Sequence, residues 1–334
     1  MGTGELTLLS TDAQNIYWMS RYLERAGHIS RLLETQFDLI HDRPASDVEL
    51  GWRRIYRSLN RTPAGASLMP AQNDDVVMLL DAYTLVDDLA FEPENPDAII
   101  DLLGKARENA RQIRNILNHE IWSTLNVSFL GMKGKRLKDI WSDQPQDFFI
   151  ASSTAVRTFC GIADATMYRD HGWHFFKLGQ YVERIQLTCA LLDAHIKLFP
   201  TNDHHWEIHW SDLLGICVAR AAFRRLQSVE CQPGRVLDFL IGDARLTNSI
   251  NYGLGEIQKR LEVISGSPDT GNKNTSAWHI GKTRALVEFE WPVHEKGNDA
   301  SIQNLLNQIR AGVLEIDSQI NNTYFNYPIE CKSV

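Results

Sequence analysis

The chain has 334 residues, of which 43% are hydrophobic and 23% are charged, and its formal net charge is −8. A chain of this length and composition can bury a large core and leaves little room for long disorder. The acidic balance excludes an overall basic field of the kind used to bind nucleic acid or anionic lipid, so we expect no nucleic-acid partner.

The first long helix is expected over residues 11–41. Thr11 and Gln14 have the spacing of a capping box, and Arg43 followed by Pro44 ends the helical pattern. One face is apolar at helical spacing, with Met19, Tyr22, Leu23, Ala26, Ile29, Leu33, Phe37 and Ile40. The opposite face is polar and, taken alone, typical of a solvated surface, with Arg21, Glu24, Arg25, His28 and Arg31.

Helical periodicity continues along the rest of the chain, with Pro and Gly between the segments. We expect further helices at about 47–60, 74–90, 96–117, 147–169, 172–198, 207–229, 245–265 and 298–325. The one short alternating stretch, Ala285 to Glu290, is compatible with helix as well as with strand. Because no linker divides the chain, we predict an all-α protein with a single domain over residues 1–334.

A short motif occurs twice. Tyr22-Leu23-Glu24-Arg25 in the first helix returns as Tyr181-Val182-Glu183-Arg184, and a pair of leucines follows each copy. The helices 11–41 and 172–198 are therefore expected to be pseudo-repeats in a multi-helix bundle with two pseudo-symmetric halves, each carrying a Glu-Arg helix. The second copy is apolar on nearly every side, which is typical of a buried helix.

Burial of the second copy has a consequence for its charges, because buried charges must be paired. Neighbouring residues on a helix point about 100° apart, so Glu183 cannot fully neutralise Arg184. We therefore expect crosswise pairs between the two helices, Glu24 with Arg184 and Glu183 with Arg25.

Two interpretations of this quartet stay open. In the first, it only fixes the register of the two helices, as buried ion-pair networks do. In the second, Arg21, Arg25 and Arg184 bind a carboxylate or a phosphate, because a guanidinium suits bidentate recognition of planar anions.

The second interpretation assigns further roles to the two motifs. Glu24 or Glu183 becomes the catalytic acid or base if burial raises its pKa. Tyr22 and Tyr181 become substrate-binding residues beside them.

A second basic face is expected in segment 96–117, where Arg107, Arg111 and Arg114 stand at i, i+4 and i+7. Like charges so spaced repel one another unless something anionic lies nearby. Solvent together with Glu108 and Asp101 is one explanation. The alternative is that these arginines form a second wall of an anion site.

Other chemistry is weakly represented. His204, His205 and His209 lie at an expected helix start that faces water, so we predict no metal site there. We expect no leader peptide, and the sequence contains no membrane-spanning apolar run and no glycine-rich phosphate loop, so we expect no membrane association and no cofactor. The cysteines are scattered and odd in number, which favours reduced thiols and a cytoplasmic location: Cys160, Cys189, Cys217, Cys231 and Cys331.

Four motifs, taken in order, resemble the bacterial alpha-E domain family, an all-helical domain named for its helices and its Glu-Arg motif. The resemblance covers nearly the whole chain. The motifs are the stretch from Asn15 to Ala26, the stretch from Ala106 to Arg111 with Glu120-Ile121-Trp122, Gly172-Trp173-His174-Phe175 before Glu183-Arg184, and Val236-Leu237-Asp238-Phe239-Leu240 with Asp243 and Arg245.

The resemblance implies an association with circularly permuted ATP-grasp ligases and transglutaminase-like peptidases, in systems that make and process amide or peptide bonds. The chain would be the alpha-E component of an ATP-grasp-type amide- or peptide-ligase pathway, recognising or modifying a carboxylate-bearing amino acid or peptide at the Glu/Arg site. Since the sequence has no ATP-grasp signature, we do not expect it to be the subunit that uses ATP. Two alternatives stay open, an enzyme acting with the ligase and a non-catalytic helical scaffold that docks to it.

Overall fold

The computed structural model describes residues 8–63, 75–141, 144–202, 207–227, 230–266, 275–293 and 297–325. In these ranges the chain is helical and forms no strand, which confirms the all-α prediction. The α-helices are α1 (Ser10–Asp42), α2 (Ala45–Ser58), α3 (Asp75–Ala90), α4 (Ile99–Gln112), α5 (His119–Met132), α6 (Leu137–Trp141), α7 (Pro145–Thr166), α8 (His171–Leu198), α9 (Glu207–Ile216), α10 (Arg220–Leu226), α11 (Pro233–Leu237), α12 (Ile250–Ser265), α13 (Ser276–Ala285) and α14 (Asp299–Ile320). Short π-helical segments lie at Asp238–Gly242, Leu286–Glu290 and Asn321–Phe325, and a 3-10 turn at Trp291–Val293.

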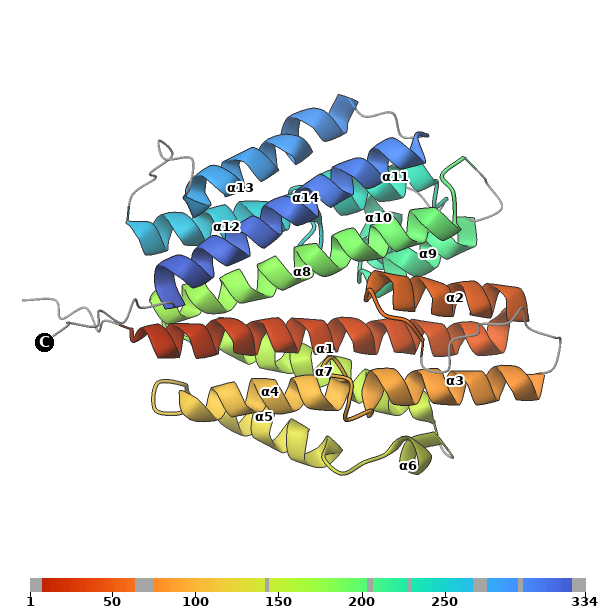
Figure 1. The fold of residues 1–334 in the computed structure, drawn as a ribbon, viewed down its shortest axis with the longest axis horizontal. Helices are drawn as coiled ribbons and strands as arrows, with labels where there is room; N and C mark the ends of the chain where they lie inside the picture. The colour runs from red at the N-terminus through yellow and green to blue at the C-terminus, as the bar shows by residue number, and fades with distance from the viewer. Residues whose placement is uncertain are drawn as a thin grey trace, which may run out of the picture.

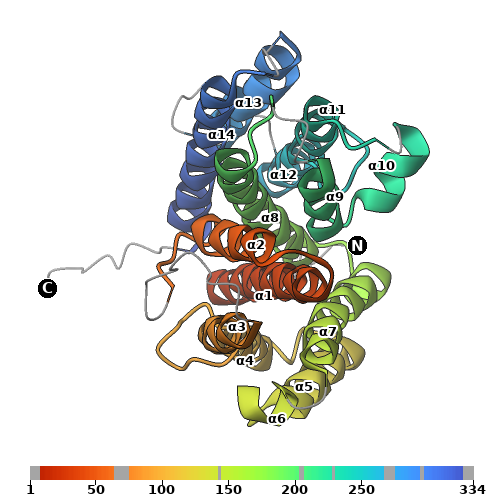
Figure 2. The same ribbon diagram turned by 90° about the vertical axis from the view of Figure 1, so that its right-hand side faces the viewer.

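The two longest helices, α1 and α8, lie against each other along the middle of the bundle (Figure 1). Viewed from the end, α3 to α7 lie on one side of this pair and α9 to α14 on the other (Figure 2). The α1 helix also packs on α4 and α7, and α8 also packs on α12 and α14. The two copies of the Glu-Arg motif are therefore on facing helices at the centre of the protein.

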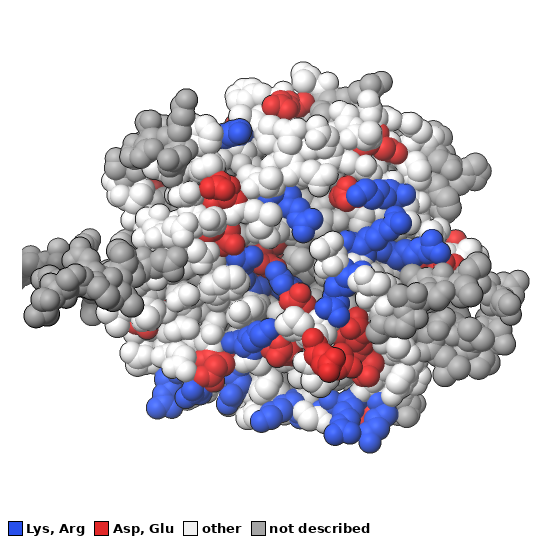
Figure 3. Space-filling model, in the orientation of Figure 1, with Lys and Arg blue, Asp and Glu red and all other residues white. Residues whose placement is uncertain are grey.

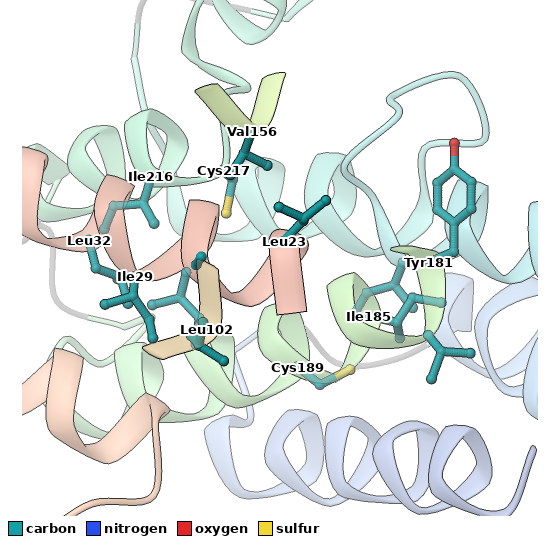
Figure 4. Close-up of a cluster of buried hydrophobic side chains, with 14 of the residues drawn as sticks. Leu23, Ile29, Leu32, Leu102, Val156, Tyr181, Ile185, Cys189, Ile216 and Cys217 are labelled. Atoms are coloured by element: carbon teal, nitrogen blue, oxygen red, sulfur yellow. The ribbon is translucent and has the colours of Figure 1, made fainter. Parts of the chain in front are cut away.

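Apolar side chains from several helices meet around this central pair. Leu23 and Ile29 of α1 pack among Leu102 of α4, Val156 of α7 and Ile216 of α9, all of them buried (Figure 4). Full burial of one such side chain stabilises the fold by about 1.5–3 kcal/mol. The α8 helix is buried along nearly its whole length, as the sequence predicted.

A glycine allows α1 and α8 to approach closely. A Cβ atom added at Gly179 would lie 2.1 Å from the Ser20 hydroxyl oxygen and 2.3 Å from the Tyr17 carbonyl oxygen. Since one of these atoms belongs to the backbone of α1, no side-chain rotation could relieve the clash. The backbones can come this close only because Gly179 has no side chain.

The helix ends follow the local signals in part. The first helix does end before Pro44, and Arg43 is extended there. It does not begin with the predicted capping box, because α1 starts at Ser10 and Leu9 at the N-cap position makes no side-chain cap. At the start of α8, by contrast, the Asp170 carboxylate accepts a hydrogen bond from the Trp173 N–H.

The structure corrects two of the predicted segments and adds helices that were not predicted. Residues 207–229 do not form one helix, because Val218 has a left-handed backbone (φ 53°) that separates α9 from α10. The α4 helix ends at Gln112, so Arg114 lies outside it. The helices α5 and α13 were not predicted, although each starts at a capping residue, Asn118 and Thr275 respectively.

The face of the molecule in Figure 3 shows no continuous field of one sign. On the face in Figure 3, lysine and arginine side chains gather along the lower edge, where α4, α5 and α6 lie in Figure 1, and acidic and basic side chains mix across the middle. Within the ranges described above, none of the helices is both long enough and apolar enough to cross a lipid bilayer.

Candidate functional site

The predicted pairing of the two motifs is present, and Glu183 binds two arginines. Its Oε1 accepts a hydrogen bond from Arg25 Nε at 2.6 Å, and its Oε2 accepts one from Arg21 Nε at 2.8 Å. Only 1% of the Glu183 side chain is exposed. The Arg25 pair is the expected one, whereas the Arg21 pair arises because residues 21 and 25 are one turn apart on α1 and point to the same side.

The other predicted pair joins Glu24 to Arg184 through two parallel hydrogen bonds. Arg184 Nε lies 2.8 Å from Oε1 of Glu24, and Arg184 Nη2 lies 2.9 Å from Oε2. The remaining Nη1 of Arg184 donates to the Thr247 carbonyl oxygen at 3.1 Å. This bidentate geometry is the strongest arrangement open to an arginine and a carboxylate.

Two carboxylates that the sequence did not reveal complete this arrangement. Asp97, in the turn before α4, accepts a hydrogen bond from Arg25 Nη1 at 2.6 Å. Asp317, on α14, accepts one from Arg21 Nη1 at 2.8 Å and one from the Tyr17 hydroxyl at 2.6 Å. No local spacing relates these two residues to the motifs, and only the tertiary fold brings them there.

We call this set of three guanidinium and four carboxylate groups the charge cluster: Arg21, Glu24, Arg25, Asp97, Glu183, Arg184 and Asp317. Every guanidinium in it is bound to at least one carboxylate. The cluster as a whole therefore carries one more negative than positive charge.

The pairing holds the Glu24 carboxyl ionised. Burial alone would raise the pKa of Glu24, but attraction to Arg184 and its hydrogen bonds outweigh that effect and lower the pKa to about 2. Burial would likewise lower the pKa of Arg184, yet attraction to Glu24 raises it. The sequence-based role of Glu24 as acid or base depends on a raised pKa, and that condition is not met while Arg184 occupies both of its oxygens.

A small cavity of about 10 Å³ adjoins the Glu24–Arg184 pair and reaches Arg31 and His28. Such a volume holds about one water molecule and no substrate. His28 is buried, and its Nε2 has no hydrogen-bond partner in the described part of the chain. Burial, followed by repulsion from Arg31, lowers the pKa of His28 to about 3, so this imidazole is neutral at ordinary pH.

The two motif tyrosines lie in different surroundings. Tyr181 is buried, and the Arg184 guanidinium lies over its ring at 5.3 Å from the centroid, so Tyr181 is beside the charge cluster. Tyr22 is half-buried, packs against Trp18 and has the Lys105 ammonium 5.8 Å from its ring centroid. A substrate-binding role for either tyrosine stays a prediction.

The three arginines of the second basic face are not part of the charge cluster. Arg107 donates to the Asn126 side-chain oxygen at 2.7 Å and lies over the rings of Trp122 and Phe129. Arg111 is exposed and pairs with Glu108 of its own helix. Arg114 is exposed beyond the end of α4. The exposure of Arg111 and Arg114 matches the solvated explanation, whereas Arg107 is half-buried. A second wall of an anion site stays a prediction.

The other polar candidates are placed as follows. His204 and His205 lie outside the described residues. His209 does not face water, because it is buried with its Nε2 3.4 Å from Asp47 Oδ2. No group of three or more metal-binding side chains occurs in the ranges that the structure describes. Four cysteines are free thiols, and Cys331 lies outside these ranges.

Comparison with known proteins identifies the family. The profile of the Alpha-E family, described as a predicted alpha-helical domain with a conserved ER motif, matches residues 8–325. The chain therefore belongs to the Alpha-E family, as its motifs suggested. Two Glu-Arg pairs of this chain, Glu24-Arg25 and Glu183-Arg184, have the sequence of such a motif, and both lie in the charge cluster.

Individual relatives are distant and longer. The chain is 23% identical over 335 residues to uncharacterised proteins of Mycobacterium tuberculosis (strains H37Rv and CDC 1551) and of Mycobacterium bovis (strain AF2122/97). Each alignment covers 94% of this chain and 37% of the relative, so the chain spans little more than a third of those proteins. No solved structure gives a significant match.

Proposed function

We propose that this Alpha-E chain acts in an ATP-grasp-type amide- or peptide-ligase pathway, as the component that recognises or modifies a carboxylate-bearing amino acid or peptide. The observation that carries the proposal is the crosswise pairing of the two motifs, which holds Arg25 and Arg184 in fixed positions largely removed from water. Guanidinium groups held in this way need little reorganisation to stabilise charge on a substrate. The link to an ATP-grasp ligase is supported by the family resemblance.

In this proposal Arg21, Arg25 and Arg184 hold the substrate carboxylate. Glu24 is a weak base as long as Arg184 is bound to it, because its pKa is about 2. A substrate carboxylate that draws Arg184 away removes the attraction that keeps this pKa low. Glu24 then becomes a proton acceptor only when substrate is present, and Glu183 is the second candidate for proton transfer.

A specific observation favours the alternative, a non-catalytic scaffold that docks to the ligase. Every arginine of the charge cluster already has a carboxylate partner, and the adjoining cavity of about 10 Å³ is too small for an amino acid. A cluster of this kind can have a purely structural role, in which it fixes the register of α1 against α8. Both versions have the same partners, the ligase and an amino acid or peptide, and the free cysteines support a cytoplasmic location for both.

The decisive experiment incubates the chain with its ATP-grasp partner, ATP and a panel of amino acids, and follows the products by mass spectrometry. We expect a product that forms only when this chain is present. Arg25→Lys and Arg184→Lys keep the charge but lose the planar fork, and folded variants should not give that product. Lys197→Arg, on the exposed end of α8, is the matched control and should behave as wild type.

The outcomes separate the alternatives. If both lysine variants fold and still support the product, the catalytic version is wrong. If they lose only co-purification with the ligase, the scaffold version is supported. If the ligase forms the same product at the same rate without this chain, and the two proteins do not associate, both versions are wrong.

A further inference from the structure

A charged groove lies along the C-terminal half of α1, between α7 and the corner from α9 to α10. Its volume is about 620 Å³, within the range of ~300–1,000 Å³ that is usual for small-molecule sites. In Figure 2, α7 and the α9–α10 corner flank the same side of α1. Four arginines and four acidic residues line it, so the groove suits a polar ligand that carries charge.

Arg31 links this groove to the charge cluster. It lines the groove and also the small cavity beside Glu24 and Arg184. Its Nε donates to the Ile216 carbonyl oxygen at 3.2 Å. Both oxygens of Glu24 are bound by Arg184, and no other acceptor in the described ranges hydrogen-bonds to the Arg31 guanidinium. The terminal nitrogens of Arg31 are therefore available to a ligand in the groove.

A second cation, Arg157 of α7, lies at the same end of the groove. Its Nη2 donates to a neutral acceptor, the Thr154 hydroxyl, at 3.0 Å. Burial lowers the pKa of Arg31, and repulsion from Arg184 and, more weakly, from Arg157 adds to that effect against the attraction to Glu24. The other two arginines differ, because Arg43 and Arg220 both lie within 4 Å of Asp212. An anion between Arg31 and Arg157 would relieve their repulsion, and this end of the groove is suited to a carboxylate.

Acidic side chains follow along the same face of α1. Glu34, Asp38 and Asp42 line the groove and are one helical turn apart. Arg31 and Asp38 are two turns apart, which is about 10 Å along the helix axis. An extended chain of three residues also spans about 10 Å. The spacing of positive and negative charge along the groove thus matches the two termini of a tripeptide.

We propose that this groove binds a short peptide, with its free carboxylate held by Arg31 and Arg157 and its ammonium group lying over the acidic residues from Glu34 to Asp42. The inference rests on the proposed function, for which it names the recognition site and the substrate class. It also moves the carboxylate site of that function from Arg21, Arg25 and Arg184 to Arg31 and Arg157, because the charge cluster itself has no room for a substrate. Binding of the carboxylate to Arg31 would then also affect Glu24 and Arg184, which line the same small cavity as Arg31.

Titration of the full chain with trialanine tests this site, with binding followed by ligand-observed NMR. We expect saturable binding that weakens about tenfold or more when the carboxylate is converted to an amide, and also when the amine is acetylated, because each change removes a charge-assisted interaction. Arg31→Gln and Arg157→Gln should each weaken trialanine binding by a similar factor. Arg57→Gln changes an exposed arginine of α2 outside the groove, and binding should stay at the wild-type value.

Three results overturn the inference. They are the absence of saturable trialanine binding, equal affinity for trialanine and its amide, and wild-type affinity in both Arg31→Gln and Arg157→Gln. Arg157 is exposed, so Arg157→Gln keeps the test valid if Arg31→Gln does not fold. If trialanine binds in the groove, but the chain has no effect on the ligase product, the proposed function is wrong and the groove site stands. If a product requires this chain, but the Arg31→Gln and Arg157→Gln variants bind trialanine as wild type does, only the proposed groove site is wrong.

Discussion

Replacing Glu183 by glutamine should destabilise the fold strongly. Glutamine keeps the shape of the side chain and one acceptor oxygen but removes the charge that neutralises Arg21 and Arg25. Removal of one partner from a buried ion pair costs about 3–5 kcal/mol, because the other charge is left without its counter-ion.

The structure narrows this range. The Arg21 side chain is 6% exposed and the Arg25 side chain 29% exposed, so water screens the loss at Arg25 more than at Arg21. Both arginines also keep a second carboxylate, Asp317 and Asp97 respectively. We therefore expect Glu183→Gln to lower the free energy of unfolding by about 3 kcal/mol, the lower end of that range. This is still a large share of the ~5–15 kcal/mol that usually stabilises a folded protein.

Urea denaturation at pH 7, followed by circular dichroism, gives the free energy of unfolding and the m-value together. Lys197→Gln is the control on the same helix, because Lys197 is 46% exposed and pairs with Asp193. That change should cost less than about 0.5 kcal/mol. If Glu183→Gln costs less than about 1 kcal/mol at an unchanged m-value, Glu183 is not the buried counter-ion that the fold requires.

Three further substitutions test other parts of the structure. Gly179→Ala should destabilise by about 1–3 kcal/mol in thermal unfolding, since the added Cβ meets the Tyr17 carbonyl oxygen at 2.3 Å; an unchanged midpoint would show that α1 and α8 are not closely packed there. The folded chain keeps His28 neutral with a pKa of about 3, so its stability contribution is complete above the unfolded pKa near 6.5 and is lost as the pH falls toward 3. His28→Leu should therefore reduce the loss of unfolding free energy between pH 7 and pH 4, and a pH profile equal to that of wild type would contradict this. The three guanidinium nitrogens of Arg54 are buried without a hydrogen-bond partner among the described residues. Arg54→Met should therefore leave the free energy of unfolding in urea unchanged or raise it. A decrease of more than about 1 kcal/mol would contradict an unsatisfied guanidinium.

The sequence predicted most helices well where an apolar face repeats without interruption. The segment expected at 172–198 is α8, His171–Leu198, because its apolar residues continue to Pro200. The α5 helix lacks such a signal, since its apolar residues Val127 and Leu130 are exposed and no one-sided stripe marks it. The break between α9 and α10 depends on Val218, and a β-branched residue gives no warning of a left-handed backbone.

The charge cluster was predictable only as far as its two motifs are repeated. Two Glu-Arg pairs in buried helices must neutralise each other crosswise, and that argument needs no coordinates. Asp97 and Asp317 lie 72 and 296 residues from the arginines that they bind, so no spacing in the sequence could reveal them. The helix predicted at 96–117 was too long, because α4 ends before Arg114, so this arginine does not share a helix with Arg107 and Arg111. The pseudo-symmetry of the two halves and the single-domain organisation stay predictions.

The charges suggest that the charge cluster and the groove have different roles, the cluster in stability and the groove in binding. Four carboxylates against three guanidiniums make the cluster repel a free carboxylate, whereas Arg31 and Arg157 attract one. Arg31 lies two turns beyond Glu24 on α1, so the cluster that holds α1 against α8 also positions the arginine that faces the ligand. Substitution of Glu24 should therefore lower stability and peptide binding together, whereas substitution of Arg157 should lower binding and leave the free energy of unfolding unchanged.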